Sequence, residues 1–242
     1  MCRVTTSIYD LPAAVANVPL AQDRFARTLS GLTDADVRES SVLPGWTRAH
    51  VIAHVARHGE AMVRLIDGVL TQRAAEAYPG GPAVRDAEIE TSAHHSIDEL
   101  VDDVYETNAS LVVSFARMTA PTWGRQVQFP TGAYPASRCA WSRWREVEVH
   151  HVDLGLDVYT IESWPEEFVS THLPHELAKL PNRLPHGTAI RVGGSRFGLG
   201  DVTATIDGPE PAVLAWLFGR VGLAAPSLRS SNGALPRLPT WR

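Results

Sequence analysis

Two residues near the middle of the chain have the types and the spacing of a metal-ligand pair. Glu146 and His150 lie four residues apart in the stretch RWREVEVHHVD at 143–153. If this stretch is helical, the carboxylate and the imidazole project from one face, one turn apart. Two ligands on one helix do not complete a site, so a third donor has to come from another segment.

The best candidate for the third donor is His54. His50, His54 and His58 recur every four residues on one predicted helix. The outer two are separated by two turns, so one metal cannot normally take all three; we expect His50 and His58 to support the site or to lie at the surface. Two imidazoles and one carboxylate suit zinc or non-haem iron, and three protein ligands leave the open position that catalytic sites keep.

A Glu-x-x-x-His pair also occurs as an ordinary contact on a helix surface. Apolar neighbours such as Val55 and Val149 favour an interior position for the ligand face instead. On the predicted helix that carries Glu146 and His150, His151 points about 100° away from His150, and we expect it to face solvent or a neighbouring domain. Glu148 points away from Glu146 for the same reason.

Composition narrows the class of protein. The chain has 242 residues, 44% apolar and 20% charged, with a net charge of −5, as in ordinary globular proteins. Neither the charge nor any basic run indicates nucleic acid or an anionic membrane as a partner. No signal-peptide core and no uninterrupted apolar run of membrane-spanning length is present, so we expect a cytoplasmic protein, a monomer or small homo-oligomer, that acts on small molecules.

Residues 1–160 are predicted to form an antiparallel four-helix bundle. Thr47 is a plausible N-cap, and Ser96 with Glu99 forms a capping-box pattern. Segment 83–93 is a candidate for a shorter helix, and turn residues in 121–135 indicate a loop or a short hairpin. Bundles build metal sites from side chains on facing helices. The four long helices are predicted over 12–32, 47–71, 96–119 and 136–156.

Residues 161–242 have a different character and are predicted to form a small α+β domain, which makes the whole chain α+β. Glycines and prolines separate short β-like runs. We expect the tail from Ala225 onwards to be loose. The predicted elements are a helix over 165–180, strands at 189–192 and 202–206, and a helix over 209–222.

The motifs GWTRAHVIAHVA at 45–56 and REVEVHHVDLG at 145–155 carry a family resemblance. Together with LFGR at 217–220, they resemble the mycothiol-dependent maleylpyruvate isomerase family, within the larger group of DinB-like metal-binding four-helix bundles. The resemblance covers most of the chain. Glu148 and His151 depart from the family pattern, and the region 181–200 matches it only loosely.

The resemblance implies that His54, Glu146 and His150 hold zinc or another divalent metal. It also implies that mycothiol, a small bacterial thiol, is the second cofactor. Arg220 matches a family arginine and would hold a substrate carboxylate, although an arginine near a helix C-terminus is also favoured by the helix dipole.

Three functions follow as hypotheses. The first is a zinc- and mycothiol-dependent cis–trans isomerase acting on maleylpyruvate or a similar small unsaturated dicarboxylate. The second is a mycothiol S-transferase that conjugates electrophiles and consumes the thiol. The third is a non-catalytic protein that binds a small molecule in its α+β domain.

Overall fold

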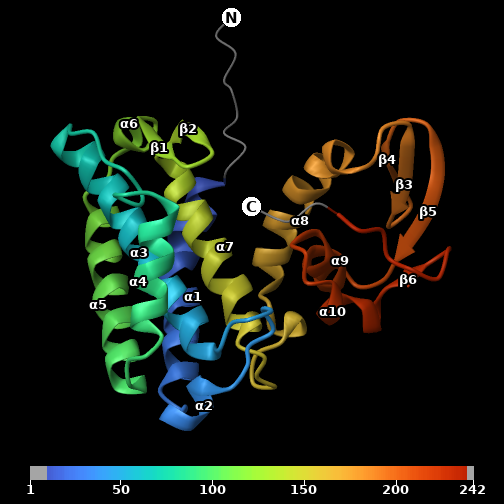
Figure 1. Cartoon of the computed structure of the whole chain (residues 1–242). Helices are drawn as coiled ribbons and strands as arrows, with labels where there is room; N and C mark the ends of the chain where they lie inside the picture. Colours follow the sequence, from blue (N-terminus) through green and yellow to red (C-terminus); the bar gives the residue numbers. More distant parts are fainter. Residues whose placement is uncertain (1–9, 239–242) are drawn as a thin grey trace, which may run out of the picture. The chain divides into compact units, whose positions relative to one another are not determined.

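The computed structural model describes residues 10–238, and the chain divides into two compact units between Val158 and Tyr159. The first unit is a four-helix bundle, and the second is a small mixed α+β unit (Figure 1). The predicted α+β class is therefore confirmed. The long helices are α1 (Leu11–Leu29), α3 (Arg48–Thr71), α5 (Ile97–Ala116) and α7 (Ser137–Asp153). Within the bundle, α3 packs against α5 and α7, and α1 packs against the same two helices.

The prediction that neighbouring bundle helices all run antiparallel is wrong. Helix α3 runs opposite to α7, where His58 meets Ser142. It runs in the same direction as α5, because the connection through the helix at 82–92 returns the chain to the end where α3 begins; Arg57 therefore pairs with Asp103, and Asp67 with Ser114.

Local sequence signals set the helix starts. Thr47 is the N-cap of α3, and Ser96 is the N-cap of α5, as predicted. The Ser96 Oγ accepts from the Glu99 backbone N–H at 3.3 Å, while Glu99 Oε2 accepts from the Ser96 N–H at 2.8 Å. This reciprocal pair satisfies N–H groups that a helix start otherwise leaves without partners.

Shorter elements connect the long helices. The segment 83–93 is largely helical, as predicted. Of the two alternatives for 121–135, a loop or a short hairpin, the structure shows the hairpin. The two hairpin strands pair antiparallel from Gln126 opposite Pro135 to Phe129 opposite Gly132. The connecting elements are α2 (Asp34–Arg38), α4 (Pro82–Ser92), α6 (Ala120–Trp123), β1 (Gln126–Phe129) and β2 (Gly132–Pro135).

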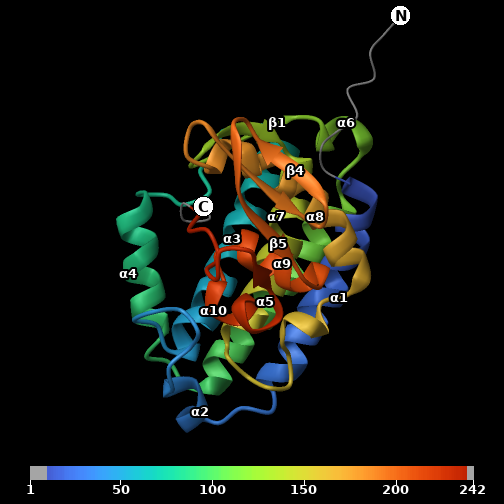
Figure 2. The same cartoon turned by 90° about the vertical axis from the view of Figure 1, so that its right-hand side faces the viewer.

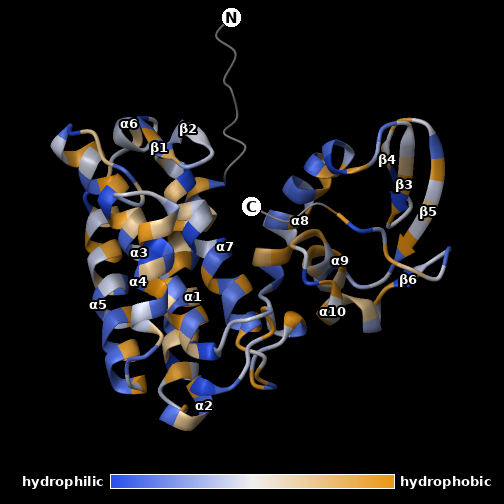
Figure 3. Ribbon diagram, viewed as in Figure 1, coloured by the Kyte–Doolittle hydropathy of each residue, from blue (hydrophilic) through white to orange (hydrophobic). Residues whose placement is uncertain are grey.

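Helix α7 is polar and yet buried along nearly its whole length. Figure 3 shows hydrophilic residues over much of it, whereas α1 and α3 carry many hydrophobic residues. Apolar residues such as Trp144 and Val149 are fully buried beside charged ones. Buried polar groups need partners to offset lost hydration, so α7 is the helix on which polar networks must be found.

The described part of the second unit combines three α-helices with a four-stranded mixed sheet of order β4-β3-β5-β6. Strands β3 and β5 are parallel, the other pairs are antiparallel, and β3, β4 and β5 lie side by side in Figure 1 and Figure 2. Rings of Trp164, Phe168 and Phe218 pack together in its core. The elements are α8 (Glu166–Lys179), β3 (Thr188–Val192), β4 (Ser195–Gly198), β5 (Asp201–Asp207), α9 (Glu210–Leu217), α10 (Val221–Ala224) and β6 (Arg229–Ser230), with 3-10 turns at Ile161–Ser163, Leu180–Arg183 and Ala225–Ser227.

Two expectations for the second unit are wrong. The helix predicted over 209–222 stops at Leu217, because Gly219 has φ of 80° and the Arg220 N–H bonds back to the Ala215 carbonyl at 2.8 Å, which closes the helix end. The tail predicted to be loose instead supplies β6, which pairs with β5. Among the described residues, no helix combines the length and apolar character that a membrane crossing requires.

Candidate metal centre

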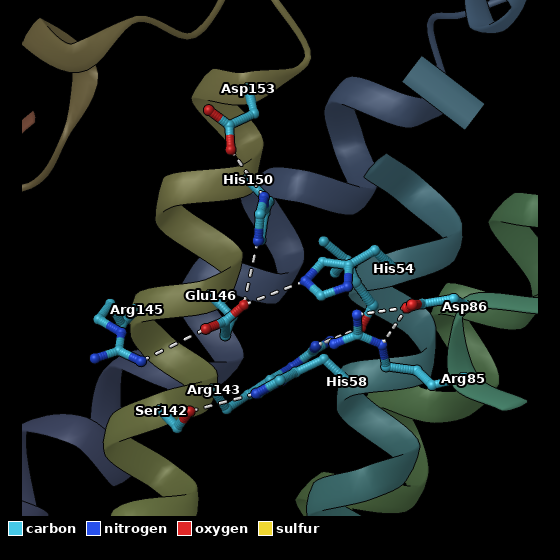
Figure 4. A network of polar contacts seen from close by, with 11 residues as sticks. His54, His58, Arg85, Asp86, Ser142, Arg143, Arg145, Glu146, His150 and Asp153 are labelled. Atoms are coloured by element: carbon cyan, nitrogen blue, oxygen red, sulfur yellow. Dashed lines mark hydrogen bonds and ion pairs between the residues drawn. The ribbon is translucent and has the colours of Figure 1, made fainter. Parts of the chain in front are cut away.

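The structure brings His54, Glu146 and His150 together. His54 comes from α3, and the other two come from successive turns of α7 (Figure 4). The Nε2 atoms of His54 and His150 lie 3.3 Å and 3.2 Å from Glu146 Oε2, and one potential ligand atom from each residue lies within 4.8 Å of the others. The three side chains are only 7–12% exposed. The pairing of the two helices therefore completes the triad that neither sequence motif holds alone.

The charge state of the triad suits a divalent cation. Burial, followed by the nearby His150, lowers the pKa of His54, so its imidazole is neutral. Burial would raise the pKa of Glu146, but the neighbouring His58 and hydrogen bonds from the two triad histidines outweigh it and hold that pKa well below the usual range. A neutral imidazole and an ionised carboxylate are the forms that coordinate metals.

His150 is oriented by a carboxylate behind it. Its Nδ1 lies 2.8 Å from Oδ2 of Asp153, which is fully buried. Burial opposes the positive charge, but the Asp153 and Glu146 hydrogen bonds raise the pKa of His150 overall. A proton on Nδ1 shared with Asp153 leaves the Nε2 lone pair for a metal, as in many metal-bound histidines. His54 differs, since its buried Nδ1 has no hydrogen-bond partner in the described part of the chain.

Asp153→Asn tests this support. We expect zinc affinity to fall by about 10–100-fold, because an amide orients the His150 ring less firmly and no longer raises its basicity. Competition with a chromophoric chelator measures the affinity. Asp157→Asn, an exposed position shortly after α7, is the matched control and should bind zinc as the wild type does. Equal affinity in both variants would contradict the orienting role of Asp153.

The other two α3 histidines take different positions. His50 is half-buried, with Nδ1 2.7 Å from Thr47 Oγ1 and Nε2 3.1 Å from Glu90. His58 is buried beside α7, with Nε2 3.3 Å from Ser142 Oγ, and burial lowers its pKa to about 3. Neither belongs to the group of three that could share one ion.

The face of α7 opposite the triad, which carries Glu148 and His151, differs from the expectation that His151 faces solvent or a neighbouring domain. His151 is 1% exposed and does not face solvent. Its ring meets that of Phe25 edge-on at 5.4 Å, and its Nε2 lies 2.8 Å from Thr28 Oγ1. Glu148 is fully buried and forms an ion pair with Arg24. Both partners come from α1, which packs along this face and removes it from solvent.

Arginines surround the triad, and sequence reasoning did not identify them. Arg143 is fully buried; its Nη1 donates to the Val55 carbonyl at 2.6 Å and its Nη2 to Asn108 Oδ1 at 2.8 Å. A Cβ at Gly59 would lie 2.3 Å from Thr107 Cγ2 and 3.2 Å from the Arg143 Cζ, so glycine at this position leaves room for both side chains. Arg145 Nη2 lies 3.5 Å from Glu146 Oε1. The surroundings of Glu146 are therefore positively charged.

For Arg143 and Asp153, the sequence contained a spacing that could have identified them. Arg143 and Asp153 each lie three residues from a predicted ligand, so the helical spacing that selected Glu146 and His150 also places them on the same side of α7.

Arg220, in the second unit, follows Gly219 at the start of α10, and its Nη1 donates to the Phe218 carbonyl at 2.8 Å. Its role in binding substrate stays a prediction.

Comparison with known proteins gives a consistent result. A family model described as the mycothiol maleylpyruvate isomerase N-terminal domain matches residues 18–155. No curated protein sequence matches the chain. The chain is similar to the crystal structure of the mycothiol-dependent maleylpyruvate isomerase, with 28% identity and a TM-score of 0.85 over 96% of this chain and 97% of that one. A histidine-to-alanine mutant of the same enzyme gives 27% identity and a TM-score of 0.85 over the same shares.

Proposed function

The chain belongs to the mycothiol maleylpyruvate isomerase N-terminal domain family, and from this premise we propose that it is a metal- and mycothiol-dependent cis–trans isomerase of maleylpyruvate or a similar small unsaturated dicarboxylate. The observation that carries the proposal is the convergence of His54, Glu146 and His150 from two helices. Their donor set, two imidazoles and one carboxylate, fits zinc with an open position.

The described part of the chain offers no reactive thiol of its own. Cys139 is fully buried, and burial raises the pKa of its thiol; Cys2 lies outside the described residues. A buried thiol of raised pKa is a poor nucleophile. This supports a separate small thiol as the nucleophile. When bound, a divalent metal lowers the pKa of a thiol that coordinates it, so that the thiolate is present near neutral pH.

The isomerisation needs temporary loss of the double bond. A bound thiol would supply a nucleophile that adds reversibly to the double bond, so that the carbon–carbon bond could rotate before the thiol leaves unchanged. No redox partner is required.

The chain's own residues would position the reactants. Asp153 holds the His150 ring, and the Trp46 ring lies 5.6 Å from that of His54 and shields it on one side. Arg143 and Arg145 bring positive charge near Glu146, which favours anionic ligands at the site. Arg220 is the candidate for binding a substrate carboxylate, because a guanidinium can bind a carboxylate through two hydrogen bonds.

A turnover assay on zinc-loaded protein tests the proposal. With maleylpyruvate and catalytic mycothiol, we expect the maleylpyruvate absorbance to change only when both zinc and thiol are present, while the free thiol concentration stays constant. Chelator-treated protein is the control. Stoichiometric loss of thiol would instead identify the S-transferase alternative. Absence of any thiol-dependent reaction, with maleylpyruvate or with simple electrophiles, would contradict both enzyme functions and favour a binding protein.

A further inference from the structure

Two arginines form hydrogen bonds across the pair of helices that carry the triad. Arg143 of α7 donates from Nη1 to the Val55 carbonyl of α3 at 2.6 Å. In the other direction, Arg48 of α3 donates from Nε to the Leu154 carbonyl at the end of α7 at 2.8 Å. Each helix therefore supplies one guanidinium and one backbone carbonyl, so that two cross-links join α3 to α7.

The two cross-links enclose the triad along both helices. On α7, Glu146 and His150 both lie between the two cross-linked positions, which are about three turns apart. On α3, His54 directly precedes Val55, and Arg48 lies about two turns before it. A single contact would leave α3 free to pivot against α7, whereas two contacts at different heights also fix the angle between the helices. The position of His54 relative to the ligands on α7 depends on that angle.

The Arg143 cross-link is held on three helices. The side chain is fully buried, and its Nη2 donates to Asn108 Oδ1 on α5 at 2.8 Å. Figure 4 shows Arg143 in the same polar network as the triad, between α7 and α3. A carbonyl oxygen has two lone pairs, so Val55 can accept from Arg143 in addition to an N–H group of its own helix. The guanidinium is therefore fixed without breaking the helix that it contacts.

The Arg48 cross-link is fixed at the other end of the site. Its side chain is only 12% exposed, and its Nη1 donates to the Asp36 carbonyl at 3.0 Å and to Glu39 Oε2 at 2.6 Å. Leu154 is the C-cap of α7, and the last carbonyls of a helix have no partner within that helix. Arg48 supplies the missing partner, and its charge suits the negative end of the helix dipole.

We infer that Arg48 and Arg143 are positioning residues, whose cross-links set the distance and angle at which the ligand on α3 and the two ligands on α7 can bind one metal ion. The inference rests on the metal centre of the proposed function and not on the identity of the substrate. Both arginines act through backbone carbonyls. A positive charge near the site by itself opposes a divalent cation, so their contribution to metal binding is geometric.

Arg143→Met and Arg48→Met test the cross-links through the affinity for zinc, measured by competition with a chromophoric chelator. Each variant should bind zinc about tenfold less tightly, near the lower limit of the loss seen when a residue that supports a ligand is removed. The two cross-links share no partner, so the double variant should lose about 100-fold. Removal of positive charge alone would have the opposite sign and raise the zinc affinity.

Cobalt in place of zinc reports the arrangement of the ligands. The visible absorption of bound cobalt depends on the number and geometry of its ligands, so both variants should change the intensity or position of the bands. Arg48→Lys keeps a positive charge and a hydrogen-bond donor on a flexible stem. It should therefore restore part of the zinc affinity that Arg48→Met loses. Should Arg143→Met not fold by circular dichroism, the Arg48 variants decide the outcome.

Arg57→Met is the matched control. Arg57 also lies on α3 and also bonds to a neighbouring helix, but its partner is Asp103 of α5, with Nη2 2.6 Å from Oδ1. Its loss should lower the stability of the bundle in urea and leave the zinc affinity and the cobalt spectrum unchanged. A merely structural role of the two cross-linking arginines would give the same result in all three variants.

Wild-type zinc affinity and cobalt spectra in the Arg48 and Arg143 variants would overturn the inference. Equal loss of affinity in Arg57→Met would overturn it too, because any weakening of the bundle would then loosen the metal. The test uses no turnover, so a protein that binds zinc without isomerising maleylpyruvate contradicts only the isomerase proposal. A wild-type protein that binds neither zinc nor cobalt would overturn the metal centre and this inference together.

Discussion

Replacing His150 by alanine is expected to abolish stable zinc binding and all thiol-dependent turnover while leaving the bundle folded. The change removes one of three protein donors and leaves Asp153 with no imidazole to orient. Removing a ligand should lower zinc affinity by more than about 10–100-fold, which is the typical loss when a residue hydrogen-bonded to a ligand is removed. Thiol activation should fail with it, because the metal is the group proposed to lower the pKa of a bound thiol.

His54→Ala should give the same result from the opposite helix, which distinguishes a shared site from a local effect on α7. Zinc content by mass spectrometry, affinity by chelator competition and helicity by circular dichroism provide the measurements. His94→Ala is the matched control, since this histidine is 77% exposed and lies outside the triad. Full zinc stoichiometry in either triad variant would rule out the His54, Glu146 and His150 site.

The triad could be predicted because its signal is local. On a helix, residues four apart share a face whatever the tertiary structure, so Glu146 and His150 were readable from spacing alone. His54 needed only a second helix with an equivalent face. The same periodicity also places Asp153 behind His150, and reading three-residue spacings as well would have identified it.

The opposite face of α7 could not be predicted in the same way. Spacing shows that Glu148 and His151 point away from the triad, but it does not show which helix packs there. The structure places α1 on that side, where Arg24 and Thr28 provide partners. A buried polar residue and an exposed one have the same sequence pattern until the packing neighbour is known.

Strand β6 was missed for a different reason. The two residues of β6 have no strand propensity that stands out over so short a length. They form a strand only because β5 offers an edge to pair with.

Replacing Arg24 by methionine is expected to destabilise the protein by about 3–5 kcal/mol, the usual cost of removing one partner of a buried ion pair. Glu148 is fully buried, whereas the Arg24 side chain is 26% exposed. The variant therefore removes the positive charge that pairs with a carboxylate inaccessible to water. Methionine keeps much of the arginine stem, so the loss reports charge more than packing.

Urea unfolding of the zinc-free protein, followed by the fluorescence of tryptophans that include Trp141 and Trp144 on α7, measures the change. Zinc-free protein is needed because a metal bound to the folded state adds its own stabilisation. Glu39→Gln is the matched control: this carboxylate is 63% exposed and lies 2.6 Å from Arg48. Loss of an exposed pair should change stability by no more than about 1 kcal/mol. Equal losses in the two variants would mean that burial does not set the cost.

The double variant Arg24→Met with Glu148→Met separates the pair from its surroundings. Buried ion pairs replaced by apolar side chains of similar volume are often neutral or stabilising, because the desolvation of both charges is removed together. The double variant should therefore be more stable than Arg24→Met alone, although it departs further from the natural sequence. If it is less stable than either single variant, the α1–α7 contact depends on polar bonds beyond this ion pair, and the buried charge of Glu148 is not the origin of the loss.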